Sequence, residues 1–124
     1  MSPKVLIVDD EPGIVVSLQF LMHQCGFEVI TASSGEEAIE AILKFHPDLI
    51  LLDVMLPGID GYEVCEIVRL DPKWRDVKII FLSAKGKEED IARGMVLGAD
   101  DYITKPYANR EVIEKIRSVL KAPD

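Results

Sequence analysis

The 124-residue sequence contains only two cysteines, one tryptophan and no apolar run long enough to cross a membrane. A membrane-spanning helix needs about 20 predominantly apolar residues, and the chain begins without the apolar core of a signal peptide. Cys25 and Cys65 form no Cys-x-x-Cys motif, so we expect two reduced, unpaired thiols. These features predict a cytoplasmic protein without a membrane partner.

Basic residues are also few, because 14 Lys and Arg face 22 Asp and Glu, which leaves a net charge of −8. Such a chain is not expected to bind nucleic acid or an anionic membrane directly. The nucleotide-binding patterns GxxxxGK[ST] and GxGxxG are absent as well. With 48% hydrophobic residues and no internal repeat or linker, we expect one globular domain over residues 1–124, either a whole protein or a fragment of a longer regulator.

Short apolar segments alternate with amphipathic ones along the whole chain. The segment Leu49-Ile50-Leu51-Leu52 is unbroken by polar residues, as in a strand buried on both faces of a parallel sheet. The same reasoning predicts strands at residues 4–8, 27–31, 49–52, 77–82 and 101–104. Helices are predicted at residues 12–25, 34–45, 61–70, 88–97 and 109–120. This alternation predicts an α/β fold in which helices cover both faces of a parallel five-stranded sheet, with the more polar strand 27–31 at an edge.

Polar residues stand where four of these strands end. They are Asp9-Asp10-Glu11, Asp53, Ser83 and Lys105. The carboxyl ends of parallel strands share one edge of the sheet, which is where ligands bind in open α/β folds. Clustered carboxylates favour a hard cation such as Mg²⁺. A carboxylate can attack a phosphoryl group whose charge an ammonium and a hydroxyl help to neutralise. The set therefore suits phosphoryl transfer to Asp53 from a donor outside this chain.

These motifs, in this order and over essentially the whole chain, resemble the receiver domain of two-component response regulators. The resemblance rests on Asp9-Asp10, Asp53 with the following MLPGIDG, Ser83-Ala84 and Lys105-Pro106. It implies a flavodoxin-like (βα)5 three-layer sandwich with strand order 2-1-3-4-5. It also implies no enzymatic activity beyond Mg²⁺-dependent self-phosphorylation and autodephosphorylation.

The resemblance further implies roles for individual residues. Asp53 would be the phosphoacceptor, Ser83 and Lys105 would contact the phosphoryl group, and Tyr102 would be the switch aromatic. The Mg²⁺ ligands would be Asp9, Asp10, Asp53 and the backbone carbonyl of Met55. The donor would be a phosphohistidine on a sensor histidine kinase or a histidine phosphotransfer protein, and the Lys105–Pro106 peptide bond would be cis.

The C-terminal part most resembles response regulators that are winged-helix transcription factors. Ala108 stands where that subfamily often has a capping Ser, so Asn109 is expected to cap the last helix. On phosphorylation Ser83 would move towards the phosphoryl group, and Tyr102 would rotate from an exposed to a buried position. The surface of helix 88–97, strand 101–104 and helix 109–120 would then change, and two copies could form a homodimer through its charged residues.

Three alternatives remain open at this point. A haloacid-dehalogenase-type phosphatase also uses a strand-end Asp, but it requires a second Asp where this chain has Met55. A flavodoxin-like electron carrier requires a Ser/Thr/Gly-rich phosphate loop, whereas the acidic residues 9–11 would repel a flavin phosphate. A receiver that no longer accepts phosphate would share the fold and act as a binding module.

Overall fold

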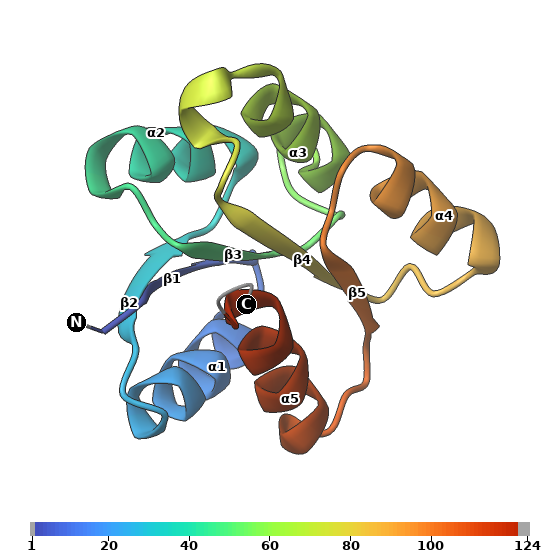
Figure 1. Cartoon of the computed structure of the whole chain (residues 1–124). Coiled ribbons are helices and arrows are strands. Elements are labelled where there is room, and N and C mark those ends of the chain that lie inside the picture. The colour runs from blue at the N-terminus through green and yellow to red at the C-terminus, as the bar shows by residue number, and fades with distance from the viewer. Residues whose placement is uncertain (1, 122–124) are drawn as a thin grey trace.

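The computed structural model describes residues 2–121, so Met1 and residues 122–124 of the predicted domain lie outside the described residues. Five strands alternate with five α-helices, and one 3₁₀ turn precedes the fourth strand (Figure 1). The strands are β1 (Lys4–Val8), β2 (Glu28–Ala32), β3 (Leu49–Leu52), β4 (Lys78–Ser83) and β5 (Asp101–Thr104). The helices are α1 (Pro12–Gln24), α2 (Gly35–Phe45), α3 (Gly61–Leu70), α4 (Glu88–Val96) and α5 (Asn109–Leu120), with the 3₁₀ turn at Pro72–Trp74.

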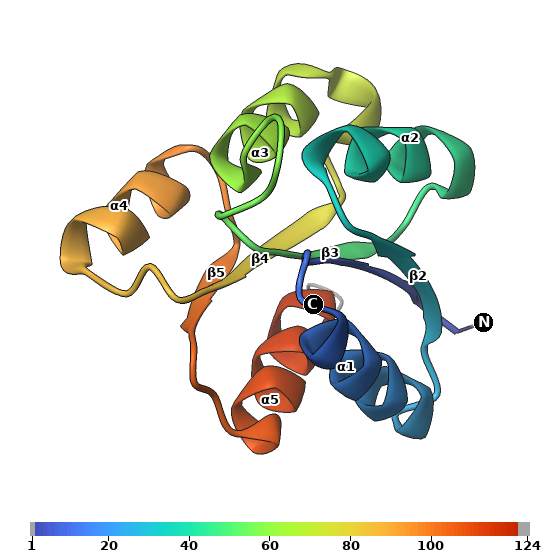
Figure 2. The same cartoon turned by 180° about the vertical axis from the view of Figure 1, so that it is seen from behind.

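All five strands are parallel and lie in the order β2-β1-β3-β4-β5, which confirms the predicted topology. Helices α1 and α5 cover one face of the sheet, while α2, α3 and α4 cover the other (Figures 1 and 2). None of the helices in residues 2–121 combines the length and apolar character that a membrane crossing requires.

Two apolar cores, one on each face of the sheet, explain the sequence pattern of the strands. Every residue of β3 is buried, because alternate side chains pack against the helices above and below. Phe81 is among the largest fully buried side chains of the core beneath α2, α3 and α4. Burying a side chain of this size contributes about 2–3 kcal/mol. At the predicted edge, β2 buries only Ala32.

The helix starts follow the expected capping chemistry at two places and depart from it at a third. The Ser34 hydroxyl accepts from the Glu37 backbone N–H, and Asp60 and Glu63 form a capping box. At α5, however, Ala108 occupies the N-cap position without a side-chain hydrogen bond, and Asn109 is the first helical residue. The prediction that Asn109 caps this helix is therefore wrong, because the helix begins one residue too early for its side chain to serve.

Two strands begin one residue later than predicted, each for the same reason. The backbone N–H of Phe27 donates to the carbonyl of Met22 at the end of α1, after the left-handed turn at Gly26. The N–H of Val77 donates to the carbonyl of Trp74 in the 3₁₀ turn. Because these groups complete the preceding turns, the sheet ladder starts at the next residue.

The two cysteines are free, as predicted. Cys65 lies in α3 within the core beneath α2, α3 and α4, whereas Cys25 directly follows α1 on the other face of the sheet. The Lys105–Pro106 peptide bond is cis, also as predicted.

Candidate functional site

The backbone carries the predicted site residues beyond the strands by continuing their hydrogen-bond ladders. The N–H of Asp9 donates to the carbonyl of Ala32 at 3.1 Å, and the N–H of Asp53 donates to the carbonyl of Val8 at 3.0 Å. The N–H of Lys105 likewise donates to the carbonyl of Ser83 at 2.9 Å. Since these residues follow parallel strands, the ladder places all three at one edge of the sheet.

The start of α3 approaches this edge closely, and only glycine permits it. A Cβ added at Gly61 would lie 2.1 Å from the backbone oxygen of Asp53, far inside van der Waals contact. The N–H of Gly61 donates to the carbonyl of Val54 at 2.8 Å, which closes the loop between β3 and α3. A side chain at this position would push the loop away from the strand end that carries Asp53.

The ammonium of Lys105 is the centre of the site. Its Nζ lies 2.9 Å from Oδ2 of Asp9, 3.1 Å from Oε1 of Glu11 and 3.2 Å from Oδ2 of Asp53. The sequence placed Asp9, Asp53 and Lys105 together correctly. Glu11 belongs to the predicted acidic run, but no role was predicted for it. Its position next to the acidic pair does not reveal which way its side chain points.

The two buried carboxylates divide their oxygens between backbone and ammonium. Oδ1 of Asp9 accepts from the Glu11 backbone N–H at 2.9 Å, and Oδ1 of Asp53 accepts from the Met55 backbone N–H at 3.2 Å. The remaining oxygen of each carboxylate contacts Lys105. Both side chains are thereby held in one orientation.

The electrostatics of the site follow from burial and crowding. Burial raises the pKa of Asp9, and the nearby Asp53 charge adds to the increase, against the opposing hydrogen bonds from Lys105 and the Glu11 backbone. Burial by itself would lower the pKa of Lys105, but its contacts with Asp9, Glu11 and Asp53 outweigh it and the pKa is raised. Lys105 is therefore a permanent positive charge among carboxylates at neutral pH.

The acidic residues also form a group with the spacing of a metal site. One carboxylate oxygen from each of Asp9, Asp10 and Asp53 lies within 4.8 Å of the others. Asp9 and Asp53 are buried, whereas Asp10 is exposed at the rim. Carboxylate oxygens with access to water are the donors that Mg²⁺ prefers, so the residues present fit this ion.

Ser83 is the last residue of β4, whereas Tyr102 is the second residue of the adjacent strand β5 and pairs with Phe81. Ser83 is fully buried, and its hydroxyl accepts from the Lys85 backbone N–H at 3.2 Å. Tyr102 is buried too, and its hydroxyl donates to the Lys85 carbonyl. The structure contains the inward position of Tyr102, so rotation from an exposed position stays a prediction.

One aromatic residue near the site was missed by the sequence reasoning. Tyr62 is buried in α3, its ring centroid lies 5.4 Å from that of Phe81, and Phe81 in turn lies 5.6 Å from Tyr102. Its place two residues after the N-cap Asp60 marks the first turn of α3, which is a usable signal. Its hydrogen bond to the α4 backbone depends on the packing of two helices and has no signal in the sequence.

Comparison with known proteins gives a consistent set of relatives. Residues 5–117 match the profile described as the response regulator receiver domain. The chain is 47% identical over 121 residues to the alkaline phosphatase synthesis transcriptional regulatory protein PhoP of Bacillus subtilis, covering 98% of this chain and 50% of PhoP. It is also 47% identical to the probable transcriptional regulator ycf27 of Pyropia yezoensis, covering 98% and 49%. The chain thus spans about half the length of these curated relatives.

Solved structures agree with the sequence relatives. A putative response regulator from Chloroflexus aurantiacus superposes with a TM-score of 0.92 and 38% identity, covering 97% of this chain and 98% of that chain. The BeF3-activated DrrB receiver domain superposes with a TM-score of 0.89 and 28% identity, covering 98% of this chain and all of that one.

Proposed function

We propose, given that this chain belongs to the response regulator receiver domain family of two-component systems, that Asp53 accepts a phosphoryl group. The donor would be a phosphohistidine on a sensor histidine kinase or a histidine phosphotransfer protein. The observation that carries the proposal is the contact of Lys105 with Asp53 at 3.2 Å beside the buried carboxylate of Asp9. This contact supports the proposal because it sets the Lys105 ammonium beside the carboxylate that we propose as the nucleophile.

The chemistry of the transfer is a displacement at phosphorus. A carboxylate oxygen of Asp53 forms a bond to phosphorus while the bond from phosphorus to the donor imidazole nitrogen breaks, and the imidazole leaves. Lys105 stabilises the charge on the transferring oxygens, and the Ser83 hydroxyl would donate to one of them after it moves. The phosphoryl group comes from a phosphohistidine, so the transfer needs no bound nucleotide. This agrees with the absence of nucleotide-binding motifs from the sequence.

Receiver domains bind Mg²⁺ at an acidic pocket, and Asp9, Asp10 and Asp53 form an acidic cluster here. We propose that these carboxylates and the Met55 carbonyl hold the ion. When bound, Mg²⁺ would neutralise charge on the phosphoryl oxygens. The Met55 side chain is more than half exposed and has no strong hydrogen-bonding group, so it cannot orient a water for hydrolysis of the acyl phosphate.

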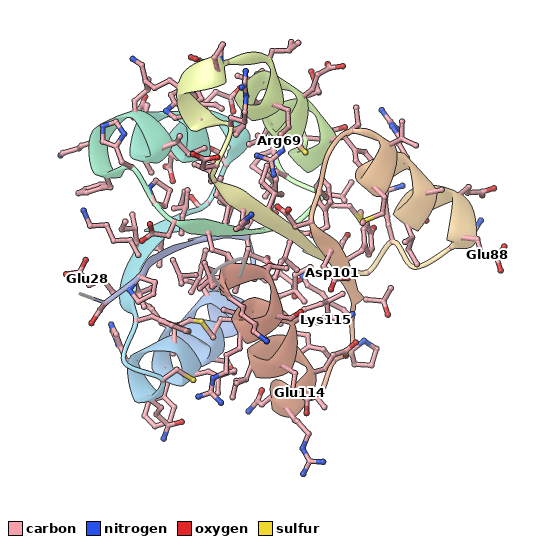
Figure 3. The ribbon with its side chains drawn as sticks, viewed as in Figure 1. Glu28, Arg69, Glu88, Asp101, Glu114 and Lys115 are labelled. Carbon is pink, nitrogen blue, oxygen red and sulfur yellow. The ribbon has the colours of Figure 1, made fainter. Side chains whose placement is uncertain are left out.

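The output is proposed to leave through the surface of α4, β5 and α5. This surface carries the acids Asp100, Asp101 and Glu111 and the bases Lys87, Lys115 and Arg117. Lys115 on α5 lies 3.3 Å from Asp101 at the start of β5 (Figure 3), and Asp100 is bound by Arg69 at 2.9 Å. Two of the three acids therefore already have partners within the chain, and homodimerisation would have to exchange or supplement these pairs. PhoP is described as a transcriptional regulatory protein, so control of transcription is the output we propose.

The test is phosphorylation by acetyl phosphate with Mg²⁺, followed by intact mass. We expect one phosphoryl adduct that is lost in Asp53→Asn and retained in the matched variant Asp76→Asn, which changes an exposed residue in the loop before β4. An adduct of the same yield in Asp53→Asn would show that the acceptor is another residue. An unlabelled wild-type chain would favour a receiver that acts only as a binding module.

A further inference from the structure

We propose that Glu11 is a positioning residue for phosphorylation of Asp53. Its carboxylate accepts a hydrogen bond from one N–H of the Lys105 ammonium, and the incoming phosphoryl group needs that N–H. The inference rests on the proposed function and adds a residue to it. Glu11 stands one position after the acidic pair, and its backbone is the N-cap of α1. The proposal concerns its side chain, which has no role in capping that helix.

The first step is a count of hydrogen bonds. A lysine ammonium has three N–H donors and no acceptor. Lys105 contacts three carboxylates, those of Asp9, Glu11 and Asp53, at 2.9, 3.1 and 3.2 Å. All three donors are thereby engaged, so Lys105 can contact a phosphoryl oxygen only after one carboxylate withdraws.

The second step is to identify the partner that withdraws. The side chains of Asp9 and Asp53 are 2% and 5% exposed, whereas that of Glu11 is 62% exposed. Asp9 and Asp53 are each held by a backbone N–H as well. Within residues 2–121 the Glu11 carboxylate accepts from Lys105 alone, so it can return to water at the lowest cost.

The third step concerns what Glu11 does before it withdraws. Its negative charge faces the same ammonium towards which an anionic phosphoryl donor must move, and it lines a cavity together with Lys105 and Pro106. Glu11 therefore competes with the phosphoryl group for Lys105. This competition slows phosphorylation and weakens binding of phosphoryl mimics, and it ends when the carboxylate swings away.

The test uses two variants that separate contact from charge. Glu11→Gln removes the charge, while Glu11→Asp keeps the charge on a side chain too short by one methylene to reach Lys105. At saturating Mg²⁺ we expect both to react with acetyl phosphate about two- to fivefold faster than wild type, the factor that corresponds to losing one exposed ion pair. Glu40→Gln makes the same charge change on the exposed side of α2 and should leave the rate unchanged.

A double-mutant cycle tests whether Glu11 acts on the phosphorylation rate through Lys105 or through a general structural effect. In a Lys105→Ala background, Glu11→Gln should no longer change the rate. The proposal is overturned if Glu11→Gln reacts no faster than Glu40→Gln, if Glu11→Asp reacts like wild type, or if the gain persists without Lys105. A wild-type chain that forms no adduct on Asp53 would instead overturn the proposed function, and this inference with it.

Discussion

The hydroxyl of Tyr62 on α3 donates a 2.9 Å hydrogen bond to the backbone carbonyl of Asp90 in α4. The Arg93 guanidinium of α4 lies 4.3 Å from the centre of the same ring. Within α4 only Gly94 is buried, and Val96 is among the most exposed apolar residues. Besides the partly buried Ile91, which packs against the core, helix α4 is held by these polar and aromatic contacts, and it has little fully buried apolar surface to resist displacement.

Tyr62→Phe should loosen α4 without altering the rest of the core. The change removes one hydroxyl and its hydrogen bond, so we expect the free energy of unfolding to fall by about 1 kcal/mol. Amide hydrogen exchange should become faster in α4 and stay unchanged in α5. Tyr107→Phe is the matched control, because the Tyr107 hydroxyl has no hydrogen-bond partner within residues 2–121. Unchanged exchange in α4 would show that other contacts hold this helix.

Asp10→Ala should weaken Mg²⁺ binding by about tenfold or more, because Mg²⁺ in proteins is held through few carboxylates. The same variant should unfold at a higher urea concentration than wild type when Mg²⁺ is absent, since one of three crowded carboxylates is gone. Calorimetric titration and urea unfolding measure the two effects, with Asp76→Ala as the control. An unchanged Mg²⁺ titration would remove Asp10 from the metal site.

Alkaline pH should destabilise the domain partly through Cys65. Burial raises the pKa of the Cys65 thiol to about 11, against an ordinary value of 9.0 for an unfolded chain. The folded state thus disfavours the thiolate, so this stabilisation is complete below pH 9 and is lost as pH rises towards 11. The loss corresponds to about 2–3 kcal/mol.

The check is the free energy of unfolding as a function of pH. Cys65→Ala should show a shallower decline than wild type between these pH values, whatever its stability at neutral pH. The decline should not vanish, because burial also raises the pKa of Tyr62 and of Tyr102. Cys25→Ala is the comparison at a half-buried thiol. A slope in Cys65→Ala as steep as in wild type would contradict the prediction.

A phosphoryl mimic should shift the chain towards a dimer. We expect BeF3⁻ with Mg²⁺ to increase the dimer fraction in sedimentation experiments, and high salt to reduce it, because exposed ion pairs are screened and contribute only about 0–1 kcal/mol each. Glu111→Lys should weaken the dimer, whereas Glu40→Lys on α2 should not. A monomer under every condition would contradict dimerisation and would leave binding of a kinase or an effector domain as the role of this surface.

The fold class and the meeting of Asp9, Asp53 and Lys105 could be predicted from the amino-acid sequence alone. Unbroken apolar runs such as residues 49–52 require burial on both faces, and that requirement leads to a parallel sheet with helices on both sides. Polar residues that follow parallel strands converge at one edge of the sheet, which explains why the sequence predicts the contacts of Lys105 with Asp9 and Asp53. The local capping signal of Asp60 and Glu63 also held, because it involves residues only three positions apart.

How the side chains share their hydrogen-bond partners could not be predicted from the sequence, because it depends on packing between elements. Lys105 is 94 residues from Glu11 and 52 residues from Asp53 in the sequence. Its contacts with both depend on how closely the loops that carry them approach one another. The hydrogen bond from Tyr62 to Asp90 depends on the angle between two helices, and the pairing of Lys115 with Asp101 depends on how α5 lies beside β5. Sequence patterns report which face of an element is apolar, whereas each of these contacts is set by packing between elements, where a shift of one or two ångströms makes or breaks a hydrogen bond.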